Sequence, residues 1–200
     1  MFGLPSTTEV SVRLPKKAFY RNMDLDSRTH AEFVSDVGGI TVVNSIKPTT
    51  ANVADGRHVH EILVMEVETK GRRLSDRVLR AIDQANECRK VFTFPSSSGI
   101  ALVFDGRIDR VMDGERELEI RGRDLDEVWE SFLSQILFDD PDGTDVEGRI
   151  ERDRRARELE REIDTLDRKV RAERQYSRKN ELYDQLRGKR QELVALKEDK

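Results

Sequence analysis

Three charged side chains near one apolar run have the types that divalent-metal chemistry requires. Glu68 and Lys70 stand two residues apart at the end of the run, and Asp55 precedes it. In metal-dependent nucleases carboxylates hold the ion while a lysine lies near the attacking water, so this set makes such a nuclease one hypothesis. A simpler explanation is that the strand ends at the protein surface, where charged residues are expected. Glu-x-Lys is also common by chance in a chain of which 38% is charged.

A small basic and aromatic patch near the N-terminus suggests a second chemistry. Arg13, Lys16 and Lys17 stand beside Phe19 and Tyr20. Such a patch can contact phosphates and stack on a base, which makes a direct nucleic-acid-binding module the second hypothesis. Aromatic residues that anchor an arm to the core, with solvated lysines beside them, are the simpler explanation.

The remaining motifs give no support to the common cofactor chemistries. The sequence has no phosphate-binding glycine loop, no dinucleotide fingerprint and no nucleophile elbow, so we expect no cofactor. His58 and His60 are two residues apart, so on a strand both imidazoles would lie on one face and could bind a metal. A surface loop explains the pair equally well, and we expect no metal. The single cysteine, Cys88, excludes an internal disulfide and fits a buried structural thiol.

Composition and charge limit the partners. The chain has 36 Lys and Arg against 40 Asp and Glu, a net charge of −4, so no global positive field attracts nucleic acid or an anionic membrane. No apolar run approaches the roughly 20 residues needed to cross a bilayer, and no signal-peptide pattern opens the sequence. We therefore expect a cytoplasmic protein without membrane contact.

Helices and strands alternate in the first two thirds of the chain, which predicts one α/β domain with a mixed sheet and flanking helices. The run within residues 61–70 is continuously apolar, so it should be a central strand buried on both faces. The turn-rich segment 95–99 predicts a hairpin loop that joins two antiparallel strands, one before it and one after it. The expected helices are 27–37 with Ser27 as N-cap, 75–86 with Ser75 as N-cap, and 124–137; the expected strands are 40–43, 61–70, 90–94, 100–104 and a possible edge strand at 118–120.

The apolar positions of these elements predict one shared core. Its expected members come from successive strands and helices and are Leu63, Val64, Ile82, Phe92, Val103, Trp129 and Phe132. The opening segment 1–25 is expected to be a partly extended arm packed on this domain.

A boundary is predicted at the acidic turn cluster near residue 140. It separates an α/β domain at 1–138 from an acidic linker at 139–147 and a charged, proline-free helical tail at 148–200. The tail has two apolar seams at coiled-coil spacing, which are its candidate interaction residues: Leu159, Ile163, Leu166, Val170, Leu182, Leu186, Leu193 and Leu196.

The phase between the two seams bears on the tail's shape. Sixteen residues separate Leu166 from Leu182, which at about 100° per residue rotates the second seam by roughly 160° on a continuous helix. A helical hairpin turning within residues 173–180 would let the seams face each other. A continuous coiled-coil helix would need two partners or a local defect, so the hairpin is favoured although that stretch holds no strong helix breaker.

Several short motifs, taken in order, resemble one family. They include Leu14-Pro15-Lys16-Lys17-x-Phe19-Tyr20, Ile46-Lys47-Pro48-x-Thr50-x-Asn52-Val53 and Leu79-x-x-Ile82-Asp83. Together they resemble the uncharacterised prokaryotic family called domain of unknown function 4391, over most of residues 1–137, and the tail looks like that family's helical C-terminus. The resemblance implies a setting near helicases and DNA methyltransferases of restriction or defence type, and it supplies no catalytic residue.

These observations favour a non-catalytic accessory or protein-interaction component of a prokaryotic DNA restriction, modification or defence system. On this hypothesis the partner is a protein, with a helicase or DNA methyltransferase suspected from the resemblance. The nuclease built on Asp55, Glu68 and Lys70, and direct nucleic-acid binding through Arg13, Lys16 and Lys17, remain the alternatives.

Overall fold

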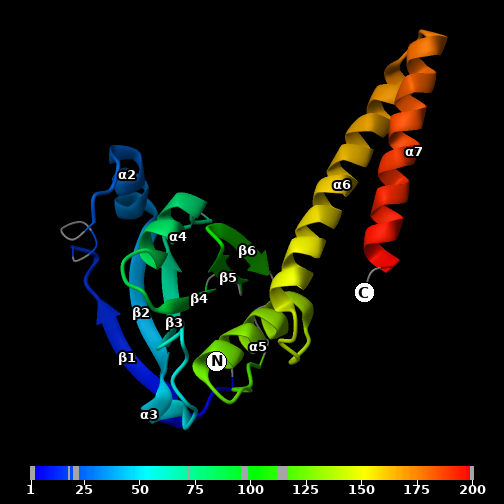
Figure 1. Ribbon diagram of the computed structural model, residues 1–200. Helices are drawn as coiled ribbons and strands as arrows, with labels where there is room; N and C mark the ends of the chain where they lie inside the picture. Colours follow the sequence, from blue (N-terminus) through cyan, green and yellow to red (C-terminus); the bar gives the residue numbers. More distant parts are fainter. Residues whose placement is uncertain are drawn as a thin grey trace. The chain divides into compact units, whose positions relative to one another are not determined.

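A six-stranded mixed sheet forms the centre of the first part of the molecule (Figure 1). The computed structural model describes residues 3–17, 19, 23–71, 73–95, 99–111 and 117–198. The sheet order is β1-β2-β3-β4-β5-β6. The strands are β1 (Glu9–Leu14), β2 (Val37–Ile46), β3 (Ile62–Thr69), β4 (Arg89–Phe94), β5 (Gly99–Phe104) and β6 (Arg107–Val111). The predicted mixed α/β class is confirmed.

The strand β3 lies inside the sheet, as its continuous apolar run predicts. It pairs antiparallel with β2 and parallel with β4, and helix α4 (Asp76–Asp83) connects the parallel pair. The pairing of β4 with β5 is antiparallel, which confirms the predicted hairpin. Residues 96–98 of its loop lie outside the described part of the chain.

The predicted helices are present, but the residues at which they begin differ slightly from the prediction. Helix α2 spans Ser27–Asp36, but its N-cap is Asp26, not Ser27, because the Asp26 carboxylate accepts from the amides of Arg28 and Thr29. Helix α5 (Leu125–Phe138) begins after the N-cap Asp124, close to the predicted bounds. Two short elements are additional: the 3-10 turn η1 (Ser6–Thr8) and helix α3 (Pro48–Ala51), in a segment expected to be a loop.

The sheet has a separate core on each face, so the prediction of one shared core is wrong. Leu63, Met65 and Val67 pack in one cluster with Phe33 of α2 and Ile82 of α4. Val64, Trp129 and Phe132 are buried but do not belong to that cluster. Successive side chains on a strand point to opposite faces, which sends Val64 away from Leu63.

Helix α5 lies on the second face. Arg89 pairs in register with Ile62 across β3 and β4, and cross-strand partners share a face. The Arg89 guanidinium lies 6.0 Å from the centre of the Trp129 ring on α5. The face of Ile62 and Val64 is therefore the one that α5 packs against.

Both sheet edges differ from the prediction. Residues 118–120 form no strand; β6 (Arg107–Val111) occupies that edge, and its polar composition hides it from a search for apolar runs. At the other edge, the expected arm contains β1, which Val10, Val12 and Leu14 could have revealed by their period of two.

Contacts divide the chain into two compact units, 1–144 and 145–200. The acidic segment expected to be a linker is ordered on the first unit: Ser131 Oγ donates to the Pro141 carbonyl at 2.8 Å, and a Cβ at Gly143 would lie 2.7 Å from the Ser131 nitrogen. Helix α6 (Val146–Ala172) starts before that segment was expected to end.

The second unit is the predicted helical hairpin. Helix α6 and helix α7 (Tyr176–Glu198) run antiparallel and contact each other along their lengths (Figure 1). The turn lies within the predicted segment, where the Glu173 carboxylate accepts from the backbone amides of Arg174 and Gln175. Ion pairs that join the two helices include Arg155 with Glu192, Lys189 with Glu162, Arg190 with Asp167 and Lys197 with Glu160.

Candidate functional site

The structure does not assemble the three residues proposed for a nuclease. Asp55 Oδ1 lies 2.9 Å from His60 Nδ1, before β3 begins, whereas Glu68 and Lys70 lie at the far end of that strand. At about 3.3 Å per residue these ends are about 20 Å apart. Within the described ranges, no three His, Cys, Asp or Glu side chains are grouped so that they could hold a metal ion.

Glu68 and Lys70 instead join the predicted basic patch. Arg13 lies 3.4 Å from Glu68 Oε2, and Lys16 donates to the Val37 carbonyl. Lys70 donates to the Val34 carbonyl at 3.2 Å, close enough to Lys16 that its charge, together with burial as the larger cause, lowers the Lys16 pKa. Arg13 and Lys16 of the arm thus lie near Glu68 and Lys70, an arrangement that sequence spacing could not show.

Lys17 and Phe19, two further members of the patch, have different surroundings. Lys17 is exposed, whereas Phe19 is buried with its ring 5.4 Å from that of Phe33. Phe19 therefore anchors the arm to the core, as the simpler explanation holds, and does not stack on a base. Tyr20 lies outside the described residues.

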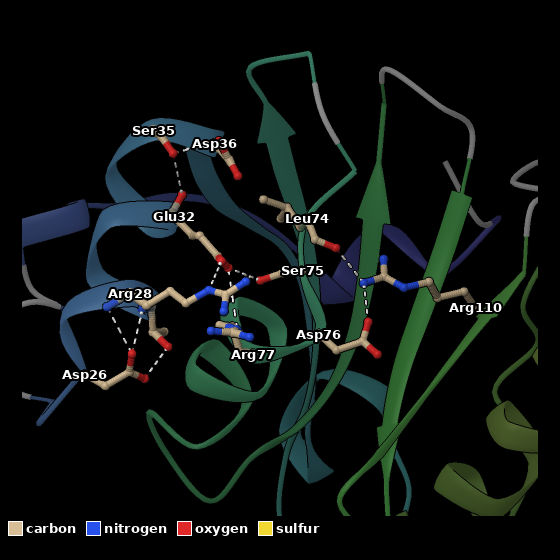
Figure 2. Close-up of polar contacts among 11 residues, drawn as sticks. Asp26, Arg28, Glu32, Ser35, Asp36, Leu74, Ser75, Asp76, Arg77 and Arg110 are labelled. Carbon is tan, nitrogen blue, oxygen red and sulfur yellow. Dashed lines mark hydrogen bonds and ion pairs between the residues drawn. The ribbon is translucent and has the colours of Figure 1, made fainter.

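A second polar network joins α2 to the start of α4 near the same end of β3 (Figure 2). Its centre is Glu32, whose carboxylate accepts from Ser75 Oγ at 2.5 Å and from Arg28 Nε at 3.2 Å, with Arg77 Nε at 3.7 Å. Ser75 occupies the predicted N-cap position, but its hydroxyl makes no capping bond because it donates to Glu32. The network therefore ties two helices that cover one face of the sheet.

Arg110 of β6 extends this network on the other side of α4 (Figure 2). Its Nη2 donates to the Leu74 carbonyl at 2.7 Å and to Asp76 Oδ1 at 2.8 Å. Its Nε is buried without a hydrogen-bond partner. These hydrogen bonds attach the loop before α4 to the edge strand β6, which gives Arg110 a structural role.

The Glu32 network predicts a loss of stability in acid. The Ser75 hydroxyl is the main cause that lowers the Glu32 pKa, and Arg28 and Arg77 add to it. A carboxyl whose pKa is lowered by folding stabilises the protein above its unfolded pKa, about 4.3, and this contribution disappears as the pH falls through the folded value. In urea melts from pH 7 to pH 3, Glu32→Gln should show a flatter decline than the wild type. The exposed Glu87→Gln should keep the wild-type slope, and equal slopes in all three proteins would contradict the prediction.

An open groove of about 750 Å³ lies on the α5 face of the sheet. Its floor includes Val43 of β2, Glu66 of β3 and Thr93 of β4, and the register Glu66 to Thr93 places the last two side by side. Glu9 of β1 and Leu4 line it as well. Sequence inspection missed the groove because six separate segments of the chain build it.

The two predicted seams of the tail meet inside the hairpin. Leu159, Val170 and Leu186 are buried, with 0%, 2% and 3% of their surface exposed. The other five seam residues are half-buried: Ile163, Leu166, Leu182, Leu193 and Leu196. The hairpin therefore covers its seams only in part.

Helix α7 also has an exposed face that the sequence analysis missed. Tyr176, Tyr183 and Val194 are 78%, 52% and 56% exposed. Their separations of 7 and 11 residues place them within about 20° of one another around the helix, roughly a quarter turn from the seam. We call these three residues the α7 stripe.

A mixed-sheet α/β domain joined to an antiparallel helical hairpin is the class of protein that these features define. The chain belongs to the family described as domain of unknown function (DUF4391), whose model matches residues 2–107 and 105–193. No curated protein and no solved structure matches it. In the described part of the chain, no helix is long and apolar enough to cross a membrane.

Proposed function

We propose that this protein is a non-catalytic interaction component of a prokaryotic DNA restriction, modification or defence system, and that its hairpin tail docks on a protein partner. The α7 stripe carries the proposal. Five large apolar or aromatic side chains are exposed in the described chain, and three of them form this stripe. Aromatic residues gathered on one exposed helix face are typical of interfaces.

The charges beside the stripe indicate what kind of surface would fit it. Lys179 and Arg187 lie on the same side of α7, within about 60° of Tyr183 around the helix. Arg190 is there as well but already faces Asp167 of α6 at 3.7 Å. A partner surface that combines apolar side chains with carboxylates would match this face, and the half-buried seam residues offer further apolar area.

The setting of the proposal comes from the resemblance of the sequence motifs, which associates the family with helicases and DNA methyltransferases. One of these is the proposed partner. The proposal does not extend to catalysis, because the one constellation suggested for it, Asp55 with Glu68 and Lys70, is spread over two ends of β3.

Affinity purification of the native full-length protein tests the docking surface. We expect the wild type to retain a helicase or methyltransferase in a fixed ratio, and Tyr176→Ser/Tyr183→Ser to retain at least about tenfold less, because the variant removes two aromatic anchors from the interface. The hairpin should persist in the variant, since both tyrosines lie outside its seam; helical circular dichroism checks this.

Val12→Ser/Val34→Ser is the matched control. These two valines are 52% and 43% exposed and belong to the α/β unit, so the control removes exposed apolar surface without touching the stripe. Equal loss of the partner in both double variants would contradict the assignment of the stripe, and a wild-type protein that elutes alone would contradict the proposed function.

A further inference from the structure

The groove on the α5 face has the size and construction of a small-molecule site. Its volume of about 750 Å³ lies within the range of roughly 300–1,000 Å³ that such sites occupy. Apolar side chains from Leu4, Val43 and Ile100 line it together with the hydroxyls of Ser11 and Thr93. An apolar lining with a few polar groups suits a ligand whose body is aliphatic.

The charge of the groove selects the sign of that ligand. Glu9 and Glu66 both line it, and its described lining contains neither Lys nor Arg. Glu66 is half-buried on an interior strand, yet it makes no hydrogen bond or ion pair with any described residue. The nearest arginine along this face, Arg13, pairs with Glu68 instead. No described residue therefore competes with a ligand for the Glu66 carboxylate.

The separation of the two glutamates favours a ligand with two charged groups. Glu9 pairs with Asn44 of β2, and Glu66 pairs with Thr41 of β2, so the two glutamates are two strands and about two residues apart. With strands about 4.8 Å apart and residues about 3.3 Å apart, their backbones are separated by about 12 Å. Among the described residues, no third His, Cys, Asp or Glu is grouped with them to form a metal-ion site.

We propose that this groove binds a linear aliphatic polyamine, with one ammonium group at Glu66 and another at Glu9. The methylene chain between the charges lies on Val43 and beside Ile100, and the Thr93 hydroxyl accepts from the ammonium at Glu66. Each charged hydrogen bond is made at a carboxylate that has no ion-pair partner among the described residues. This inference rests on the α/β unit alone and is independent of the docking proposed for the tail.

Calorimetric titration of the full-length protein with spermidine tests the site. At about 0.15 M salt, where long-range attraction to acidic surfaces is screened, we expect saturable binding of one molecule per chain. Glu66→Gln and Glu9→Gln should each weaken binding at least about tenfold, because each removes one charged hydrogen bond.

Two further variants separate a binding role from a structural one. Glu87→Gln removes the same charge at the opposite end of β4, outside the groove, and should leave the affinity unchanged. Glu66→Thr should abolish binding while the melting temperature stays equal or rises, since threonine suits a strand better than glutamate.

Three results would overturn the proposal. They are the absence of saturable spermidine binding to the wild type, equal weakening by Glu87→Gln and Glu66→Gln, and tighter binding of an extended arginine-containing tripeptide than of spermidine by about tenfold or more. The last result would assign the groove to a peptide instead.

Discussion

Replacing Phe132 by Ala should lower the free energy of unfolding by about 3–5 kcal/mol. The ring of Phe132 is fully buried in α5, between the buried neighbours Trp129 and Ile136 along the helix. Truncation removes the transfer free energy of the ring and leaves a cavity that the rigid helix and sheet can fill only in part. Urea denaturation followed by tryptophan fluorescence measures the loss, because Trp129 lies in the same core.

Phe132→Leu provides the graded control for this prediction. It keeps most of the apolar volume, and we expect a loss of about 1 kcal/mol. If Phe132→Ala cost less than about 1 kcal/mol, the core between α5 and the sheet would not contribute to stability as its burial implies.

Replacing Lys90 by Met should also destabilise the protein, by about 2–3 kcal/mol. Lys90 is 2% exposed, and its ammonium donates to the carbonyls of Asp83, Asn86 and Cys88 at 2.6, 3.1 and 2.8 Å. These carbonyls lie at the end of α4 and in the turn after it, where the helix leaves its last carbonyls without partners. Methionine preserves the packing of the stem but donates nothing, so the carbonyls lose a charged donor.

An opposing effect limits the size of this loss. Burial lowers the pKa of Lys90, which shows that removing the ammonium from water has a cost that methionine does not bear. We expect the unsatisfied carbonyls, together with the nearby Asp83 carboxylate, to outweigh that relief. Urea melts at pH 7 of the wild type and Lys90→Met decide between the two effects. An unchanged or higher midpoint would show that desolvation is the larger one.

Local pattern predicted the elements whose environment is uniform along their length. The run in β3 is apolar on both faces because both faces are buried, and α5 repeats its apolar residues at helical spacing because one side packs on the sheet. The opposite case is β6, an edge strand that has no apolar run because it contains Arg107, Asp109 and Arg110. Its identity as a strand follows from pairing with β5, which no local pattern encodes.

The candidate sites show the same division. Spacing placed Glu68 beside Lys70, and the structure keeps them at one end of β3. Proximity in sequence could not bring in Asp55, which precedes the opposite end of the same strand. The patch of Arg13 and Lys16 meets Glu68 only because β1 and β3 both pair with β2. Glu66 gains its interest because the described lining of the groove holds no Lys or Arg, a property of five strands together.

The sequence by itself determined the mixed α/β class, the change to a charged helical tail and the pairing of two seams in a hairpin, because periodicity and phase are local properties of a chain. Only the tertiary structure decided at which residues of the predicted segment the hairpin turns and which charges remain unpaired. The Glu173 carboxylate closes the turn by binding two amides that follow it, without any strong helix breaker in the segment. Likewise, one glutamate on β3 is neutralised and its neighbour two residues earlier is not, because an arginine from another strand reaches only one of them.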